Sequence, residues 1–366
     1  MSVRTRSTVA ALPPYRAGRS PADLARELGI ADAIKLASNE VPFGPLPSVV
    51  EAIAVTAAGS LHRYPDPACR ELTAALAARH GVSTAEIQVG PGTVGLCQHL
   101  ALAFAGPGDD VVFAWRSFEA YPVVTGQVGA RAVQVPLDGD HRHDLAALAE
   151  AVTDRTGLVF VCNPNNPTGT ANRAAELEKF LDAVPGDVLV VLDEAYREFV
   201  TDPDVPDGLE LARGRRNVAV LRTFSKAYGL ASLRVGYCVA NPEVVEALRR
   251  VTVPFAVNTL AQAAALASLE PAAAAELAER VTAVTAERDR VAAELARMGV
   301  DIPPESQTNF IWLPLAGEAG PEFTAACERR GVIVRPYTPD GVRVTIGTAA
   351  ENDAFLSVVA NTLAAR

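Results

Sequence analysis

Three polar side chains of different chemistry follow apolar runs that are typical of buried strands. Lys226, Asp193 and Asn166 each come within five positions of the end of such a run. Open α/β sheets bind their ligands at the carboxyl ends of their strands, so we expect these three side chains to meet at one site. A lysine amine held there can form an imine with an aldehyde cofactor. An aspartate emerging from a buried strand needs a cationic partner, and a protonated pyridine nitrogen is one such partner.

Each of these residues also has a simpler interpretation when it is taken by itself. A loop lysine is usually just exposed, and an aspartate after a strand can cap the next helix. Asn166 lies in the proline-rich turn 163–169, and a plain turn would need no ligand. The combination of the three, with Tyr196 three residues after Asp193, favours a binding site.

A glycine-rich turn follows a fourth strand-like run, earlier in the chain. The glycines at 90, 92 and 95 match the spacing of a dinucleotide fingerprint. The acidic residues that should end the second strand instead precede the strand-like run 111–114, so we reject a nicotinamide cofactor. A glycine turn that feeds a helix N-terminus still offers free N–H groups to an anion. We therefore predict that Gly92, Thr93 and Val94 form a phosphate cradle.

The pattern of elements predicts an α/β fold with two domains. Strand-like and helix-like runs alternate through the middle of the chain, and several strand-like runs are apolar at every position. Such strands are covered on both faces, so we expect a mostly parallel sheet between helices, plus a smaller α+β domain. The charged side of the helix expected over 276–298, which includes Arg288, is predicted to face solvent. The predicted organisation is an N-terminal arm (1–34), a small domain (35–60 with 252–366) and a large cofactor-binding domain (61–251).

Composition excludes several classes of function. The 366 residues carry a formal net charge of −10, which argues against nucleic acid or an anionic membrane as a partner. No run approaches the ~18 apolar residues of a membrane span. The five cysteines contain no CxxC pair, which predicts reduced thiols and a cytoplasmic location. The segment 141–143, His-Arg-His, fits no metal-ligand spacing and is predicted to be a solvated loop, so no metal site is expected.

Taken together, the motifs resemble those of the fold-type I, pyridoxal-phosphate-dependent aminotransferases. The glycine turn, NPNNPTG, DEAY and TFSKAYGLASLRVG occur in the order of that family, and the resemblance covers nearly the whole chain. Within the family the chain resembles the histidinol-phosphate aminotransferase branch, and most closely the aromatic amino acid (phenylalanine) aminotransferases of actinobacteria. The segments that carry this finer resemblance are 35–40 (KLASNE), 63–66 (RYPD), 115–119 (WRSFE) and 332–337 (VIVRPY).

The resemblance implies roles around a pyridoxal phosphate cofactor. Lys226 would hold the cofactor as an imine and, once released, move the proton from the substrate Cα. Asp193 would keep the pyridine nitrogen protonated, which makes the ring an electron sink. Asn166 and Tyr196 would hydrogen-bond the phenolic oxygen, and Phe118 would stack on the ring.

The same resemblance implies a phosphate site shared between two subunits. The residues implied in binding the phosphate are Thr93, Ser225 and Arg234, with Thr223 as a further candidate beside the predicted cradle. Tyr64 would reach the phosphate from the other subunit, which implies a homodimer.

Four further residues are implied in substrate binding. Arg343 would bind the α-carboxylate with its planar, two-pronged guanidinium, and Asn39 would lie beside it. Tyr15, on the N-terminal arm, would close over the substrate. Arg335 is ambiguous, because its counterpart in the histidinol-phosphate enzymes holds the substrate phosphate. In an aromatic enzyme it could instead face the glutamate side chain or stack on a ring.

The expected function is a ping-pong aminotransferase for phenylalanine, tyrosine and tryptophan, with 2-oxoglutarate and glutamate as the other pair. Histidinol-phosphate aminotransferase is the alternative, because the two substrates differ only at the far end of the pocket. A C–S lyase on the same fold is a further alternative. A cofactor-binding regulator is disfavoured, because the 34-residue arm is too short and not basic enough for a DNA-binding segment.

Overall fold

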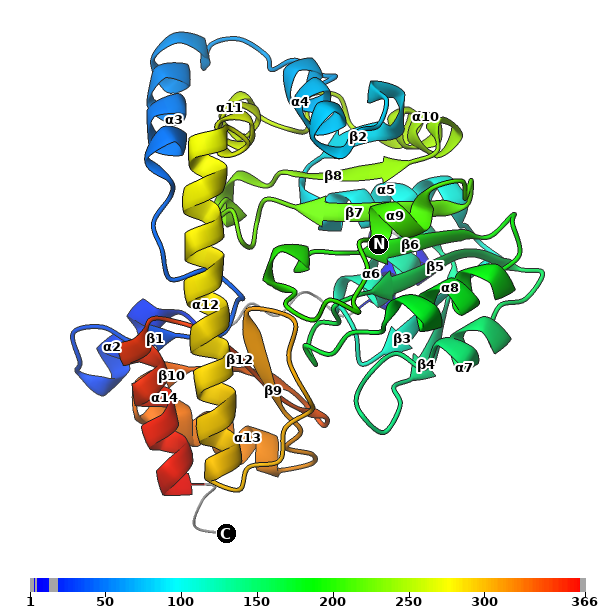
Figure 1. The fold of residues 1–366 in the computed structure, drawn as a ribbon. Helices are drawn as coiled ribbons and strands as arrows, with labels where there is room; N and C mark the ends of the chain where they lie inside the picture. The colour runs from blue at the N-terminus through cyan, green and yellow to red at the C-terminus, as the bar shows by residue number, and fades with distance from the viewer. Residues whose placement is uncertain (1–2, 4, 13–18, 363–366) are drawn as a thin grey trace.

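A computed structural model of the chain describes residues 3, 5–12 and 19–362, and its largest feature is a seven-stranded sheet (Figure 1). Its strands are β2 (Ile87–Gly90), β3 (Asp110–Trp115), β4 (Arg131–Pro136), β5 (Thr156–Cys162), β6 (Leu189–Asp193), β7 (Val218–Thr223) and β8 (Gly236–Ala240). Their spatial order is β2-β8-β7-β6-β5-β3-β4. The prediction of a mostly parallel sheet is confirmed, because only the two pairings of β8 are antiparallel among these described strands.

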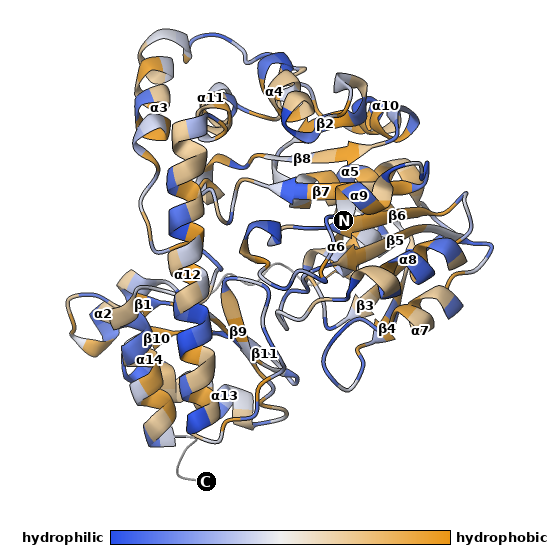
Figure 2. Ribbon diagram, viewed as in Figure 1, coloured by the Kyte–Doolittle hydropathy of each residue, from blue (hydrophilic) through white to orange (hydrophobic). Residues whose placement is uncertain are grey.

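Helices cover both faces of this sheet, which explains why its strands are apolar at every position. One face carries α5 (Gly92–Phe104), α6 (Ala120–Val128) and α10 (Pro242–Val251). The other carries α7 (Leu145–Glu150), α8 (Ala174–Ala183) and α9 (Gly208–Ala212). Neighbouring strand residues alternate between the two cores: Val191 packs in the first and Val190 in the second. Figure 2 shows β5, β6 and β8 in mostly hydrophobic colours.

The reversal of β8 brings the glycine turn close to the end of β7. The connection 224–235 contains only the short 3₁₀ helix η3 (Ala231–Leu233), which suits an antiparallel neighbour, because a parallel crossover usually contains an α-helix. At the start of β8, Gly236 permits a close approach. A Cβ on Gly236 would lie 2.9 Å from the carbonyl oxygen of Arg222 and 3.2 Å from the amide nitrogen of Thr93.

A second group of strands combines the early and late parts of the chain. β9 (Phe310–Leu313), β11 (Arg335–Tyr337) and β12 (Gly341–Thr345) form an antiparallel sheet of order β11-β12-β9. β1 (Ile34–Lys35) pairs in parallel with β10 (Val332–Ile333). The helices of this region are α2 (Pro21–Leu28), α13 (Ala319–Arg329) and α14 (Ala349–Thr362). The β1–β10 pairing agrees with an early segment in the small domain, while the proposed domain boundaries themselves stay a prediction.

Long helices link the two groups of strands. α11 (Thr259–Ser268) packs against α3 (Pro47–Ser60), and the 27-residue α12 (Pro271–Arg297) extends from there to the small sheet (Figure 1). The other described helices are α1 (Ser7–Ala10), α4 (Arg70–His80) and the 3₁₀ helices η1 (Thr84–Glu86) and η2 (Arg197–Phe199). Among the described residues, none of these helices combines the length and apolar character that crossing a membrane requires.

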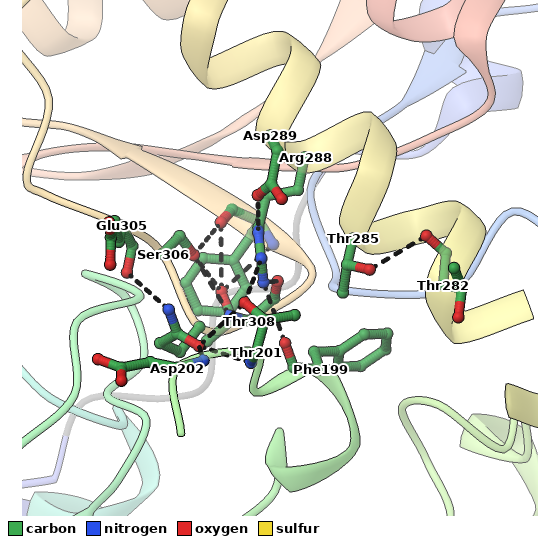
Figure 3. A network of polar contacts seen from close by, with 12 residues as sticks. Phe199, Thr201, Asp202, Thr282, Thr285, Arg288, Asp289, Glu305, Ser306 and Thr308 are labelled. Atoms are coloured by element: carbon green, nitrogen blue, oxygen red, sulfur yellow. Dashed lines mark hydrogen bonds and ion pairs between the residues drawn. The ribbon is translucent and has the colours of Figure 1, made fainter. Parts of the chain in front are cut away.

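Two polar residues lie deeper than the sequence pattern predicted. Arg288, expected on the solvent side of α12, is 2% exposed. Its guanidinium donates to the carbonyl oxygens of Phe199 and Thr308, because the loops that carry these residues pack on that side of the helix (Figure 3). His143, expected in a solvated loop, is buried, and its Nε2 lies 3.0 Å from Oδ1 of Asn165. Both expectations of solvent exposure were wrong.

Candidate active site

A cavity of about 650 Å³ lies where β5, β6 and β7 end, and it reaches β11 and β12. Most of the predicted site residues line it, namely Asn39, Thr93, Val94, Phe118, Asn166, Asp193, Tyr196, Thr223, Ser225, Lys226, Arg234, Arg335 and Arg343. A second cavity of about 520 Å³, beside Arg288, is lined by none of the predicted residues. The expected meeting of strand ends is therefore present in the structure.

Lys226 enters the cavity from the loop after β7. Its Nζ donates a hydrogen bond to the carbonyl oxygen of Ser38, at 3.2 Å. Burial of the ammonium group, with the Arg343 guanidinium nearby, lowers the pKa of Lys226 to about 7. A large fraction of this amine is therefore neutral near pH 7 and available as a nucleophile or a base.

Asp193 ends β6 beneath the cavity and is 1% exposed. Its Oδ2 accepts a hydrogen bond from the Tyr121 hydroxyl at 2.8 Å, whereas its Oδ1 is buried without a partner. Burial raises the pKa of Asp193 to about 6. The Tyr121 ring is held by stacking on Phe160, with 4.5 Å between ring centroids. A cationic hydrogen-bond donor would satisfy the open oxygen and restore the carboxylate charge.

Gly92, Ser225 and Arg234 form a cup of hydrogen-bond donors at the N-terminus of α5. Arg234 has a φ of 56°, which turns its side chain back so that Nη1 donates to Ser225 Oγ at 3.1 Å. Gly92 has a φ of 73°, and a Cβ there would lie 2.6 Å from Nη2 of Arg234. Thr93 is buried beside it, and the Thr223 hydroxyl accepts from the Ser225 amide at 3.1 Å. This cup suits a small anion such as a phosphate group.

Two neutral side chains, Tyr196 and Asn166, lie between Asp193 and the small sheet. The Tyr196 hydroxyl accepts a hydrogen bond from Nδ2 of Asn39 at 2.7 Å. Asn39 is itself fixed, because its Oδ1 accepts from the Thr345 hydroxyl. Oδ1 of Asn166 accepts from Nη1 of Arg343 at 2.5 Å. Hydrogen bonds thus join residues of β12 to the connections that follow β5 and β6.

Arg343, in the middle of β12, is a buried guanidinium with neutral partners. Its Nη1 also donates to the Tyr337 hydroxyl at 2.8 Å, and its Nη2 donates to the carbonyl oxygen of Ala37 at 2.7 Å. Its Nε is buried without a hydrogen-bond partner. Its planar guanidinium can bind a carboxylate through two parallel hydrogen bonds.

Arg335, the cross-strand neighbour of Arg343 on β11, also lines the cavity and is paired with a carboxylate. Its Nη2 lies 2.9 Å from Oε2 of Glu119. Sequence reasoning missed Glu119 as a site residue, and it also missed Tyr121. Both stand within three positions of Phe118, so the segment after β3 could have indicated them. Their partners lie 216 and 72 residues away, which a sequence pattern does not reveal.

Among the described residues, two of the predicted ones do not line the cavity, namely Tyr64 and Gly92, which lies in the cup at the N-terminus of α5. Tyr64 is 82% exposed and stacks on Phe255, with 4.7 Å between ring centroids. Tyr15 lies outside the described residues. Within the described part of the chain, no group of three or more His, Cys, Asp or Glu side chains could hold a metal ion.

The cavity therefore combines four chemical capabilities. Lys226 supplies an amine that can lose its proton near neutral pH, and Asp193 supplies a carboxylate with one open oxygen. The cup around Arg234 and the guanidinium of Arg343 offer two separate anion sites. Such a site can bind a molecule that is negatively charged at both ends. Its amine can then move a proton at an atom between those ends.

Comparisons of sequence agree with this arrangement. Residues 31–359 match the family Aminotransferase class I and II. The chain is 59% identical over 354 residues to the aromatic amino acid aminotransferase of Thermobifida fusca, covering 96% of this chain and 95% of that protein. It is 55% identical over 357 residues to the aromatic amino acid aminotransferase of Streptomyces avermitilis, covering 98% and 97%. The resemblance inferred from the motifs is confirmed.

Solved structures show the same fold. The histidinol-phosphate aminotransferase of Sinorhizobium meliloti, in complex with pyridoxal-5′-phosphate, superimposes with a TM-score of 0.88 and 31% identity over 99% of this chain and 98% of that one. A single mutant of the aspartate aminotransferase of Thermus thermophilus gives a TM-score of 0.85 and 23% identity over 99% and 100%. At that identity, the second likeness concerns the fold alone.

Proposed function

Because the chain belongs to the family of class I and II aminotransferases, we propose that it transfers amino groups between aromatic amino acids and 2-oxoglutarate. The products would be aromatic 2-oxo acids and L-glutamate, formed in a ping-pong sequence on pyridoxal phosphate. The observation that carries the reaction is one cavity holding the Lys226 amine, the open Asp193 oxygen and the Arg343 guanidinium. The aromatic substrate class is supported by the names of the two actinobacterial relatives.

The residues present fit pyridoxal phosphate. The open Oδ1 of Asp193 is where a protonated ring nitrogen would find its partner. The cup formed by Gly92, Thr93, Ser225 and Arg234 would hold the phosphate. Lys226 supplies the amine that would attach the cofactor. Each of these donors or acceptors is buried or lines the cavity.

The chain's own residues would divide the work as follows. Bound pyridoxal phosphate would supply an aldehyde carbon that takes up the amino group and a ring that accepts electrons. Lys226, with its pKa near 7, would move the proton at the substrate Cα. Asp193 would hold the proton on the ring nitrogen, and Arg343 would bind the α-carboxylate. A planar, two-pronged grip on that carboxylate fixes the orientation of the Cα–H bond.

Three neutral side chains would position the cofactor ring. Phe118 would cover one face of the ring, while Asn166 and Tyr196 would hydrogen-bond its phenolic oxygen. The proposal includes a homodimer in which Tyr64 reaches the partner's phosphate site, supported by its exposure outside its own cavity. It also includes a cytoplasmic location, supported by the five cysteines, which are all free thiols.

Histidinol phosphate is the second candidate substrate, and one observation favours it. Arg335 lines the cavity, and the similar structure from Sinorhizobium meliloti is a histidinol-phosphate aminotransferase. A phosphate at the far end of the substrate would need such a cation.

Paired steady-state kinetics test the choice between the two substrates. Phenylalanine and histidinol phosphate, each with 2-oxoglutarate, are compared on the same purified protein. We expect kcat/KM to favour phenylalanine by tenfold or more, which is about 1.4 kcal/mol of transition-state preference. A tenfold preference for histidinol phosphate would overturn the aromatic assignment.

Spectroscopy tests the reaction class separately. Glutamate should bleach the cofactor absorbance and 2-oxoglutarate should restore it, and Lys226→Ala should abolish this cycle. Absence of bleaching by glutamate would contradict an aminotransferase and favour a lyase, which returns the cofactor to its aldehyde form after each turnover.

A further inference from the structure

We infer that Glu119 determines substrate preference by keeping Arg335 paired, so that the far end of the cavity favours an uncharged ring over an anionic group. The inference rests on the proposed function and concerns its substrate class. Glu119 comes from the segment between β3 and α6, and Arg335 comes from β11, so the pair joins the large and small groups of strands across the cavity.

The cations of this cavity fall into two kinds according to their partners. The described hydrogen bonds of Lys226, Arg234 and Arg343 all go to neutral oxygens, such as Ser38 O and Ser225 Oγ. No carboxylate appears among these partners, so the three basic side chains remain available to an incoming ligand. They are the groups that the proposed function assigns to the cofactor and the α-carboxylate.

The two other arginines that line the cavity are paired with carboxylates. Arg335 lies 2.9 Å from Glu119, and Arg19 lies 2.6 Å from Glu328. All four side chains line the same cavity. Arg19 also pairs with Glu27, so both arginines at this end have carboxylate partners before any substrate arrives.

A cavity end whose arginines already have carboxylate partners suits an aromatic ring. The wall around the pair includes apolar side chains that a ring can contact, namely Phe118, Val123, Val124, Ile333, Val334 and Pro336. A ring adds no charge, so the Arg335–Glu119 pair can remain closed beneath it. The Arg335 guanidinium also lies 5.8 Å from the centroid of Tyr337, whose hydroxyl contacts Arg343, so the pair is linked to the carboxylate anchor.

An anionic far end has to compete with Glu119. A phosphate carries close to two negative charges at pH 7 and would face the Glu119 carboxylate at the same guanidinium. The side chain of the substrate L-glutamate carries only one negative charge, so Glu119 repels it less strongly than it repels a phosphate. The side chain of Glu119 is 41% exposed, so it can turn towards solvent when such a group binds. Discrimination by repulsion of the wrong group is a common source of specificity.

The test is Glu119→Gln, which removes the charge and keeps the shape. The expected result is that the ratio of kcat/KM for phenylalanine to that for histidinol phosphate falls by tenfold or more. Binding should show the same change without turnover. In isothermal titration calorimetry of the holoenzyme, the variant should bind glutarate more tightly than the wild type does, with little change for 3-phenylpropanoate.

Two comparisons separate this role from a general charge effect. Glu328→Gln removes one of the two carboxylates that pair with Arg19 in the same cavity, and the ratio in this variant should change less than threefold. In an Arg335→Leu background, adding Glu119→Gln should leave the ratio unchanged, because the effect acts through that guanidinium.

Each other outcome has a definite meaning. An unchanged ratio in Glu119→Gln, or an equal shift in Glu328→Gln, would overturn the inference while leaving the proposed function intact. If the wild type did not transaminate phenylalanine at all, the proposed function itself would fail. Normal cofactor absorbance and circular dichroism of each variant confirm that folding is unchanged.

Discussion

Lys226 and Asp193 lie in one cavity, and the protein shifts their pKa values towards neutrality from opposite sides. Burial lowers the pKa of the lysine to about 7 and raises that of the aspartate to about 6. Each group therefore has a reduced charge near neutral pH when nothing is bound. A ligand with a positive ring nitrogen and an aldehyde would use both groups, because it provides the partner that Asp193 lacks and reacts with the neutral amine.

The lowered pKa of Lys226 predicts the pH dependence of cofactor attachment. Only the neutral amine attacks an aldehyde, so the rate at which pyridoxal phosphate joins the apoenzyme should be level above pH 7. Below pH 7 it should fall about tenfold per pH unit, as the protonated form comes to dominate. Protonation of Asp193 near pH 6 acts in the same direction. Stopped-flow absorbance measures the rate.

The control for this prediction is a lysine free in solution, whose pKa is near 10.4, so that its rate rises throughout the same range. A rate that still rises tenfold per unit between pH 8 and 9.5 would show that the protein does not lower the pKa of Lys226.

At the scale of elements, α12 holds the two groups of strands together through Arg288. The guanidinium donates to Phe199 O at 3.0 Å, to Thr308 O at 3.2 Å and to Thr201 Oγ1 at 3.1 Å. Figure 3 shows Arg288 reaching from the helix into the space between the loops that carry these partners. One side chain therefore satisfies buried carbonyl groups from segments more than 100 residues apart.

Replacing Arg288 should destabilise the fold more than any exposed arginine of the same helix. Arg288→Met leaves two buried carbonyl oxygens without donors and should lower the free energy of unfolding by about 2–4 kcal/mol. The matched variant is Arg290→Met, which loses pairs with Glu287 and Asp353 at a side chain that is 38% exposed. It should lower that free energy by less than about 1 kcal/mol. Urea unfolding measures both, and equal losses would contradict the bridging role.

The elements differ in how much of their structure can be predicted from the sequence. The strand expected over 188–192 is found at Leu189–Asp193, because burial on both faces leaves an unbroken apolar run. The reversal of β8 was not predicted, because strand direction depends on the connection and leaves the run unchanged. The burial of Arg288 was missed for a similar reason: its partners come from distant loops.

The same distinction applies to the site. The predicted site residues were found because their types and order follow a known family, and thirteen of them line one cavity. Glu119 and Tyr121 were missed because their roles come from pairing with Arg335 and Asp193 across the fold.

At the scale of the whole molecule, apolar side chains are exposed along α3 and the loops near it. Those exposed by more than 40% of their surface include Val50, Val55, Leu61, Tyr64, Val253 and Phe255. Tyr64 and Phe255 stack on each other within this group. A cluster of this kind is typical of a surface that another protein covers, and a second copy of the chain agrees with the proposed homodimer.

The proposed role of Tyr64 predicts complementation between two defective subunits. Tyr64→Ala should weaken pyridoxal phosphate binding by about tenfold, since it removes one hydrogen bond to a charged group. Lys226→Ala removes the attachment point. In a mixed dimer, the site on the Tyr64→Ala subunit has its own Lys226 and receives an intact tyrosine from the partner. Random exchange should therefore give about a quarter of all sites full cofactor affinity.

The measurement is activity at limiting cofactor, after the two variants are mixed, unfolded and refolded together. Refolding each variant alone and then mixing provides the control for dimers that do not exchange. Activity above the sum of the two separate samples indicates that Tyr64 acts on the partner's site. If the protein sediments as a dimer and mixing gives only that sum, Tyr64 does not contribute to the cofactor site of the partner subunit. The proposal of a phosphate site shared between subunits would then be wrong. If the protein sediments as a monomer, the apolar surface on α3 has some other partner, and each cavity binds its cofactor without a second chain.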